Sequence, residues 1–248
     1  MIKILLCGAC GKMGGNVLSL LQDDTEAVAV CGVDLYPKEI GIPVHQSFEN
    51  VTEKVDVIID FSSPIGLQER LEFAKKNNVG IVLASTGFSE ADLAMIESYQ
   101  NDVAIFKTAN LSLGINLMQA LVKAAAQVLG EAFDVEIIER HHNLKKDAPS
   151  GTALMLAESV NEAFGGEKEY LYGREGIVGA RGKEIGLHAV RGGTIVGEHE
   201  VMFAGEDEII TITHSASSKR VFAAGAIRAA KFLSGKAAGM YAMKDILA

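Results

Sequence analysis

The chain has 248 residues, 48% of them hydrophobic and 22% charged, with a formal net charge of -9 at pH 7. This length can bury the core of one large domain or two modest ones, and we expect two. No apolar run approaches the roughly 18 residues of a membrane span and no cleavable leader is evident, so we expect a cytoplasmic protein without a membrane partner. The negative charge argues against a nucleic-acid partner, because binding phosphates requires a basic face.

The three cysteines, Cys7, Cys10 and Cys31, are a sparse and odd count that suits a reducing compartment. Cys7 and Cys10 have the spacing of a redox pair or of half a zinc site, but the chain has no second cysteine pair. We therefore interpret all three thiols as small core or loop residues.

The N-terminal segment predicts a strand, a glycine turn and a helix in succession. Residues 2–7 form a mostly apolar run typical of a buried strand in a parallel sheet, and apolar residues at helical spacing begin after the turn. Gly8, Gly11 and Gly14 lie between the two, where glycines let the backbone approach a pyrophosphate at the helix N-terminus. This spacing is less specific than the commoner G-x-G-x-x-G motif.

Asp34 follows the second predicted strand, residues 27–33, about 20 residues beyond the glycine turn. An acidic side chain at this position would bind the ribose hydroxyls of a dinucleotide and would repel a 2′-phosphate, so NADH should serve at least as well as NADPH. The alternative is that Asp34 merely begins the turn before Tyr36 and Pro37.

Further strands are predicted at residues 55–61, 79–84 and 103–106, separated by helical patterns at 66–77 and 90–100. Alternating strands and helices indicate an α/β fold, a Rossmann-like doubly wound parallel sheet. The loops after successive strands gather at one edge of such a sheet, so residues 61–64, 84–87 and 108–111 could line a cofactor crevice. Each of these loops alone could equally be an ordinary turn.

After residue 112 the pattern changes to a second, smaller α+β domain. Apolar residues at helical spacing predict a long amphipathic helix over 113–129. Strands are predicted at 185–190, 194–196, 199–203 and 208–213, and glycines at 192–193 and 205 are hairpin signals, so the sheet should be mixed and largely antiparallel. The glycine-rich stretch 170–193 could be a lid or an oligomer contact. Residues 221–233 and 239–247 should return to the first domain, which would comprise 1–112 completed by 217–248, with 113–216 as the second domain.

The stretch from Glu139 to Thr152 gathers imidazoles, ammoniums and a candidate anion site in one connection between a predicted strand, 135–139, and a predicted helix, 153–160. We expect an irregular loop to present His141 and Lys145. Free N–H groups at the helix start would bind a carboxylate or phosphate. The alternative is a solvated basic loop in which Ser150 is an ordinary N-cap.

The remaining histidines of interest, His188, His199 and His214, lie on predicted strands, where we expect packing or satisfied hydrogen bonds rather than catalysis. The cysteines, histidines and carboxylates show no convincing metal-ligand spacing, so we predict no metal site.

The 139–152 stretch and the glycine turn together resemble the 4-hydroxy-tetrahydrodipicolinate reductase family, also called dihydrodipicolinate reductase, and the resemblance runs nearly end to end. It also covers Asp60-Phe-Ser, Ser85-Thr-Gly-Phe, Arg191-Gly-Gly-Thr-Ile-Val-Gly-Glu-His and Ala216-Ser-Ser. The resemblance implies a two-domain homotetramer that uses NADH or NADPH to reduce a cyclic imine dicarboxylate in lysine and diaminopimelate biosynthesis. It also implies that the central strands of the second domain form most subunit contacts.

The resemblance also implies roles for individual residues. His141 would be the proton donor and Lys145 a second acid. The expected substrate contacts are His142, Ser150, Gly151 and Thr152. The expected cofactor contacts are Gly8, Ala9, Cys10, Gly11, Lys12, Met13, Asp34, Ala84, Ser85, Thr86, Thr108, Ala109, Asn110 and Leu111.

The chemistry of the residues agrees with these roles. Hydride delivered to a ring conjugated with C=N leaves electron density that a positioned acid must protonate, which suits His141. An ammonium beside the developing negative charge stabilises it, which suits Lys145. Two alternatives remain open at this point: a regulator that senses NADH without turnover, and a dehydrogenase of amino or keto acids.

Overall fold

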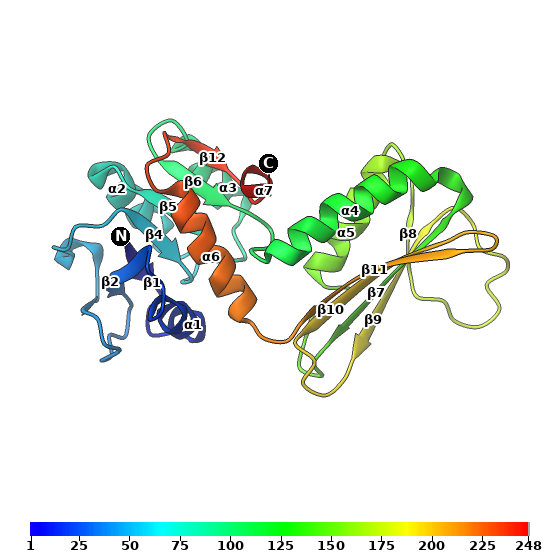
Figure 1. Cartoon of the computed structure of the whole chain (residues 1–248), viewed down its shortest axis with the longest axis horizontal. Coiled ribbons are helices and arrows are strands. Elements are labelled where there is room, and N and C mark those ends of the chain that lie inside the picture. The colour runs from blue at the N-terminus through cyan, green and yellow to red at the C-terminus, as the bar shows by residue number, and fades with distance from the viewer. Residues whose placement is uncertain (248) are drawn as a thin grey trace. The chain divides into compact units, whose positions relative to one another are not determined.

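The computed structural model describes residues 1–247, which form two compact units (Figure 1). Unit 1 comprises Met1–Ser112 together with the chain from Arg220 onward, and unit 2 comprises Leu113–Lys219. The chain therefore leaves unit 1 once and returns to it once.

Unit 1 contains a seven-stranded sheet in the order β12-β6-β5-β4-β1-β2-β3, and its paired strands all run parallel. This confirms the predicted Rossmann-like sheet. The strands β3 and β12 were not predicted, because two or three residues carry no periodic signal. The strands are β1 (Ile2–Cys7), β2 (Ala27–Val33), β3 (Val44–His45), β4 (Val57–Asp60), β5 (Gly80–Leu83), β6 (Ala104–Lys107) and β12 (Gly239–Tyr241).

Helix α6 (Arg220–Leu233) contacts β4, β5, β6 and α1, so this later part of the chain packs in unit 1. Glycines let α6 lie close to its neighbours in unit 1. A Cβ at Gly225 would overlap the Leu111 carbonyl oxygen. On the sheet side, a Cβ at Gly80 would lie 2.9 Å from Leu233 Cδ2. The other helices of the unit are α1 (Lys12–Leu21), η1 (Phe48–Asn50), α2 (Leu67–Asn77), α3 (Glu90–Ser98) and α7 (Lys244–Leu247).

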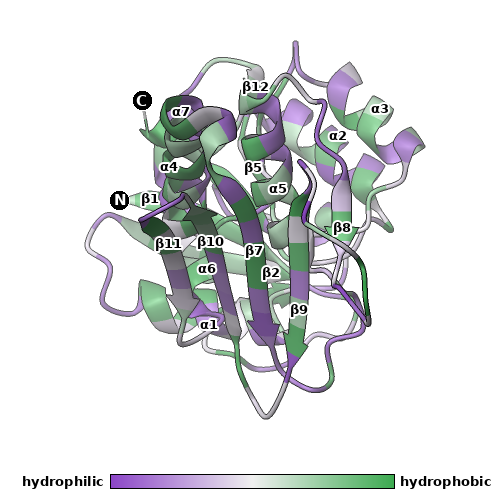
Figure 2. Cartoon of the chain, turned by 90° about the vertical axis from the view of Figure 1, so that its right-hand side faces the viewer, coloured by the Kyte–Doolittle hydropathy of each residue, from purple (hydrophilic) through white to green (hydrophobic). Residues whose placement is uncertain are grey.

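Unit 2 is a five-stranded mixed sheet in the order β11-β10-β7-β9-β8 (Figure 2), with two helices on one face. Along β7, Val135 and Ile137 point to the helices and pack with Met118 and Val122 of α4 and Leu156 of α5. The elements are α4 (Leu113–Leu129), η2 (Gly130–Ala132), β7 (Asp134–His141), α5 (Gly151–Ala163), β8 (Tyr170–Tyr172), β9 (Ile185–Arg191), β10 (Gly197–Ala204) and β11 (Ile209–Ala216).

Two details of the predicted second sheet are wrong. Residues 194–196 form no strand, and the glycines at 192–193 do not make a hairpin, because β9 pairs in parallel with β7. The reason is the position of β7, which lies between β9 and β10 and pairs antiparallel with β10. The hairpin predicted at Gly205 is confirmed: it joins β10 and β11, and the Gly205 N–H donates to the Glu208 carbonyl at 2.9 Å.

By length and composition alone, Leu113–Ala132 could cross a membrane, with a mean hydropathy of 1.2. Core helices of globular proteins pass the same test. Ile115, Met118, Val122 and Ala126 of this segment lie in the core of unit 2, so one face of the helix packs in that core.

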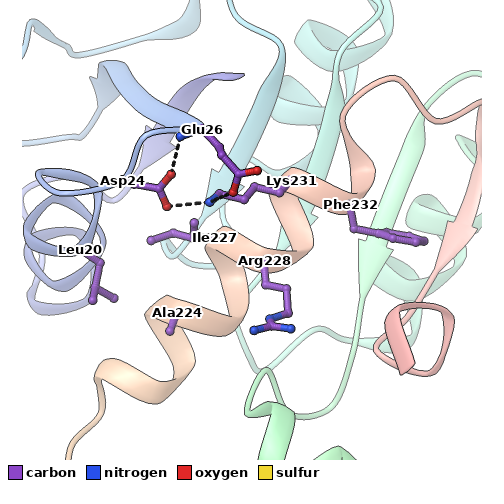
Figure 3. Close-up of a pocket in the computed structure, with 8 residues that line it drawn as sticks. All are labelled: Leu20, Asp24, Glu26, Ala224, Ile227, Arg228, Lys231 and Phe232. Carbon is purple, nitrogen blue, oxygen red and sulfur yellow. Dashed lines mark hydrogen bonds and ion pairs between the residues drawn. The ribbon is translucent and has the colours of Figure 1, made fainter. Parts of the chain in front are cut away.

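A charge cluster ties α6 to the turn before β2 in unit 1 (Figure 3). Lys231 Nζ lies 2.8 Å from both Asp24 Oδ2 and Glu26 Oε2. Asp24 in turn accepts the N–H groups of Glu26 and Ala27, at 2.9 and 3.0 Å. The hydrogen bond from Lys231 holds the pKa of the Asp24 carboxyl below its usual value.

Replacing Lys231 by methionine is expected to lower the free energy of unfolding by about 0.5–1 kcal/mol at pH 7, as for other partly exposed ion pairs. Because the folded-state pKa of Asp24 is depressed, this stabilisation is present above the ordinary carboxyl pKa and is lost as pH falls through the folded value. A double-mutant cycle with Asp24→Asn, measured by urea unfolding at neutral and acidic pH, checks it. Equal effects of Lys231→Met with and without Asp24 would contradict the coupling.

Candidate active site

The glycine turn of unit 1 connects β1 to α1 and depends on its glycines for close backbone contacts. Gly8 has φ +70, and a Cβ there would lie 2.8 Å from the Phe61 carbonyl oxygen at the end of β4. A Cβ at Gly14 would lie 2.6 Å from the Gly8 carbonyl oxygen and nearer still to that of Ala9. Within residues 1–247, no side chain caps the N-terminus of α1. The turn therefore fits a pyrophosphate at a helix start.

Asp34 follows β2 and faces the glycine turn. Its carboxylate accepts the N–H of Cys10 at 3.0 Å through Oδ2 and the N–H of Tyr36 at 3.0 Å through Oδ1. Beside it lies a pocket of about 400 Å³. Tyr36 and Ile65 line this pocket and are 78% and 84% exposed, so they offer apolar surface to an adenine ring. This region fits the adenosine half of a dinucleotide.

A buried ion pair supports the other wall of this pocket. Arg70 Nε lies 3.0 Å from Asp60 Oδ2, and both side chains are almost fully buried. Burial raises the pKa of the Asp60 carboxyl, although the Arg70 guanidinium opposes the shift. The Arg70 NH groups donate to the carbonyls of Ile65 at 2.9 Å and Ser63 at 2.6 Å, which holds the turn after β4 in place. This pair was not predicted from the sequence.

The remaining predicted cofactor residues lie at the same edge of the sheet. Residues 84–86 directly follow β5, and residues 108–111 directly follow β6. The strand order reverses between β1 and β4, and open parallel sheets bind ligands at this switch point, outside the carboxyl ends of the strands. Unit 1 thus brings the predicted cofactor residues together on one ligand-binding edge.

In unit 2, the side chains of β7 alternate between the two faces of the sheet, and two ionisable side chains lie on the same face as the core residues. Glu139 and His141 point to the same face as Val135 and Ile137, and they are 1% and 8% exposed. His141 is the last residue of the strand rather than part of a loop, because the Gly192 N–H donates to its carbonyl at 2.9 Å. The expectation that a loop presents His141 was therefore wrong.

Glu139 is the centre of a buried polar cluster. Its carboxylate receives Arg191 through both NH groups at 2.7 Å, the Ser150 N–H at 2.9 Å and the Nδ1 atom of His141 at 2.6 Å. Burial alone would raise the pKa of this carboxyl, but the hydrogen bonds from Arg191, His141 and Ser150 leave it below its usual value. Glu139 is therefore ionised at neutral pH.

His199, on β10, closes the cluster on its other side. Its Nε2 lies 2.9 Å from Ser150 Oγ, and its ring centroid lies 5.2 Å from that of His141 in an edge-on arrangement. Burial, helped by the charge of the nearby His141, lowers the pKa of His199 to about 4, so this ring is neutral at pH 7. The Ser150 hydroxyl also accepts the Ala153 N–H and so caps α5.

The loop between β7 and α5 carries the other predicted residues. Lys145 Nζ lies 2.9 Å from both carboxylate oxygens of Asp147, and this contact lowers the pKa of Asp147. His142 is partly buried. Apart from its chain neighbours and the backbone of its own helix, a Cβ at Gly151 would lie within 4 Å of no atom of residues 1–247, so the surface over the first turn of α5 is open to a ligand.

Two members of the cluster, Glu139 and Arg191, were given no role from the sequence. His199 was expected to pack or to make satisfied hydrogen bonds, and its contact with Ser150 fits that expectation, although its place beside His141 was not predicted. One signal could have found Glu139. In the alternating pattern of the strand, Glu139 occupies a position that faces the core, and a carboxylate buried there needs hydrogen-bond or ion-pair partners. Arg191 and His199 could not be assigned in this way because the pairing of β9 and β10 with β7 was not known.

No group of three or more His, Cys, Asp or Glu side chains in residues 1–247 is placed to hold a metal ion. The cofactor edge of unit 1 and the acid–base cluster of unit 2 define the class of protein: an NAD(P)H-dependent oxidoreductase.

Comparison with known proteins narrows this class. The models of the dihydrodipicolinate reductase N-terminus and C-terminus match residues 2–111 and 114–247. The chain is 48% identical to the 4-hydroxy-tetrahydrodipicolinate reductase of Caldanaerobacter subterraneus subsp. tengcongensis and 41% identical to that of Clostridium botulinum, covering 100% of this chain and 98% of each relative. The chain therefore belongs to the dihydrodipicolinate reductase family.

Solved structures agree with this assignment. A dipicolinate-bound dihydrodipicolinate reductase from Paenisporosarcina sp. TG-14 aligns with a TM-score of 0.82 at 26% identity, over 99% of both chains. A probable dehydrogenase from Thermotoga maritima aligns with a TM-score of 0.65 at 12% identity, over 98% of this chain and 92% of that one, and shares the fold.

Proposed function

We propose that this chain reduces 4-hydroxy-tetrahydrodipicolinate, or dihydrodipicolinate, to tetrahydrodipicolinate with NADH or NADPH, in lysine and diaminopimelate biosynthesis. The observation that carries the proposal is the buried Glu139–His141 pair beside the Lys145 loop and the start of α5. A reductase of similar structure is described as bound to dipicolinate, a planar ring with two carboxylates. Such a ligand fits a site with imidazoles, an ammonium and a helix N-terminus.

In this proposal unit 2 binds the substrate. The two carboxylates would contact His142, Lys145 and the start of α5 at Ser150, Gly151 and Thr152. The open surface over Gly151 leaves room for one of them. Lys145 would leave Asp147 for the substrate, because a ligand carboxylate offers its ammonium an equivalent partner.

Unit 1 would hold the cofactor. Gly8, Ala9, Cys10, Gly11, Lys12 and Met13 would contact the pyrophosphate and Asp34 the ribose. The loops after β5 and β6 would contact the nicotinamide half through Ala84, Ser85, Thr86, Thr108, Ala109, Asn110 and Leu111.

Bound NAD(P)H supplies the hydride, and the residues of this chain manage the protons and charge. His141, protonated at Nε2, would donate to the ring atom that gains electron density. A Cβ at Gly197 would lie 3.1 Å from that nitrogen, so the glycine keeps the approach to Nε2 uncrowded. Lys145 would stabilise the developing negative charge and could serve as the acid for loss of a hydroxyl group.

Steady-state kinetics should show NADH used at least as well as NADPH, because a 2′-phosphate would meet the Asp34 carboxylate. We expect Asp34→Ser to shift the ratio of the two kcat/KM values towards NADPH by about tenfold, equivalent to about 1.4 kcal/mol. Asp23→Ser is the matched control, since Asp23 is exposed and does not line the pocket. A large NADPH preference in the unmodified protein would refute the role of Asp34.

The direct test of the function is NADH oxidation by the purified protein when aspartate semialdehyde, pyruvate and a separate synthase generate the substrate. Turnover that requires all components supports the reductase. A sensor that binds NADH without turnover would show cofactor binding alone, and it would have no use for His141 together with Lys145. An amino- or keto-acid dehydrogenase would act on those acids without the synthase.

We also infer a cytoplasmic homotetramer without nucleic-acid or membrane partners, in line with the net charge of -9. Val190 on β9 and Ile209 on β11 are 45% and 64% exposed and would be covered by other subunits. Light scattering after size-exclusion chromatography tests the tetramer.

A further inference from the structure

We propose that Glu139 is a positioning residue that holds His141 with its Nδ1 protonated and favours the imidazolium form from which Nε2 donates. This inference rests on the proposed function, in which His141 is the proton donor. Glu139 is 1% exposed and acts only through the imidazole, so it is not itself a catalytic residue.

The hydrogen bonds determine the tautomer. Both oxygens of the Glu139 carboxylate accept hydrogen bonds, and the Oε2 atom lies 2.6 Å from His141 Nδ1. A carboxylate held ionised by Arg191 can only accept, so Nδ1 must carry a hydrogen. Nε2 is then the nitrogen that gains and releases the transferable proton.

The charged and titratable groups near His141 lie on β7, β9, β10, β11 and the loop between β7 and α5. Glu139 on β7 favours a positive ring, whereas Arg191 on β9 and Lys145 in the loop oppose it. His199 on β10 and His214 on β11 both have lowered pKa values because of burial. Among residues 1–247, Glu139 is the carboxylate in direct contact with the His141 ring.

Arg191 links Glu139 to the loop between β7 and α5. Besides binding Glu139, its NH2 group donates to the Asp147 carbonyl at 2.6 Å, and Asp147 holds Lys145. One guanidinium therefore connects the support of the proposed proton donor to the segment that carries the proposed second acid.

A purely structural role for Glu139 is the competing explanation, and the same strand offers a control. Glu136 lies on the opposite face of β7, where it contacts Arg174, Arg181 and His188 at 2.9, 3.1 and 2.7 Å. These contacts outweigh the effect of burial and lower its pKa to about 2. Glu136 thus has the same kinds of partner as Glu139 but no contact with His141.

The experiment compares Glu139→Gln with Glu136→Gln by NADH oxidation across neutral and alkaline pH, with the synthase in excess. We expect Glu139→Gln to lower kcat by about 10- to 100-fold, as for other groups that orient a functional histidine. The alkaline limb of its profile should move to lower pH, because the imidazolium loses its stabilising carboxylate. NADH affinity should not change, and Glu136→Gln should keep the unmodified profile. An unshifted limb in an active Glu139→Gln protein would overturn the inference.

A second measurement needs no folded Glu139 variant. Proton–nitrogen NMR of the histidine rings in the unmodified protein reports the tautomer, and His141→Gln identifies the signal. A neutral His141 with its proton on Nδ1 supports the inference, and a proton on Nε2 overturns it. Failure of the unmodified protein to turn over substrate would refute the proposed function instead, and the tautomer would still be measured.

Discussion

Replacing His141 by glutamine is expected to lower kcat by about 10²- to 10⁴-fold, the usual contribution of a positioned general acid. Glutamine keeps a donor that can reach Glu139 but has no proton to release at neutral pH. The buried carboxylate therefore retains a partner, and the loss should be chemical rather than structural. NADH affinity, measured by fluorescence titration, should be unchanged because the cofactor residues belong to unit 1.

His188→Gln is the matched control for this prediction. His188 also donates to a carboxylate, that of the partly buried Glu136 at 2.7 Å, but it lies on the other face of the sheet. Its replacement should leave kcat within about twofold of the unmodified value, since surface changes away from a site usually have small effects. A His141→Gln protein that loses cofactor affinity in proportion to its activity would show that the imidazole supports the fold instead.

The second large effect is expected for Gly14→Ala, in the first turn of α1. The new Cβ would meet the backbone carbonyls of Gly8 and Ala9, which cannot rotate away as a side chain can. Either the helix or the glycine turn must move, so we expect the free energy of unfolding to fall by about 1–3 kcal/mol. NADH affinity should fall by at least about tenfold, because the turn would no longer present its N–H groups to the pyrophosphate.

Gly15→Ala tests whether the effect belongs to the contact rather than to the loss of a glycine. Gly15 is the next residue of the same helix and is exposed. Apart from its chain neighbours and the backbone of its own helix, its Cβ would lie within 4 Å of no atom in the part of the chain that the structure describes. Alanine there should stabilise the protein by about 0.5–1 kcal/mol through its higher helix propensity. Urea unfolding and NADH titration of both variants check the pair. Similar affinity losses in both proteins would contradict the contact argument.

Local sequence patterns determined the parallel sheet of unit 1 and its glycine turn. Buried parallel strands are continuous apolar runs, and helices with an apolar stripe repeat every three to four residues, so both can be recognised within a short window. The 139–152 stretch could be recognised for a similar reason, since His141, Lys145 and Ser150 are close in sequence.

Only the tertiary structure shows which residues contact the 139–152 stretch from other strands. Arg191 and His199 reach Glu139 and His141 because β9 and β10 pair on either side of β7. The sequence instead predicted a hairpin at residues 192–193, because turn glycines report a local reversal but not which strand lies beside which. Strand partners are chosen by long-range packing, here the joint burial of Ile137, Leu187 and Val201 under α4 and α5. That burial also places Glu139 where a carboxylate must be paired, a requirement that the order of residues along the chain does not reveal.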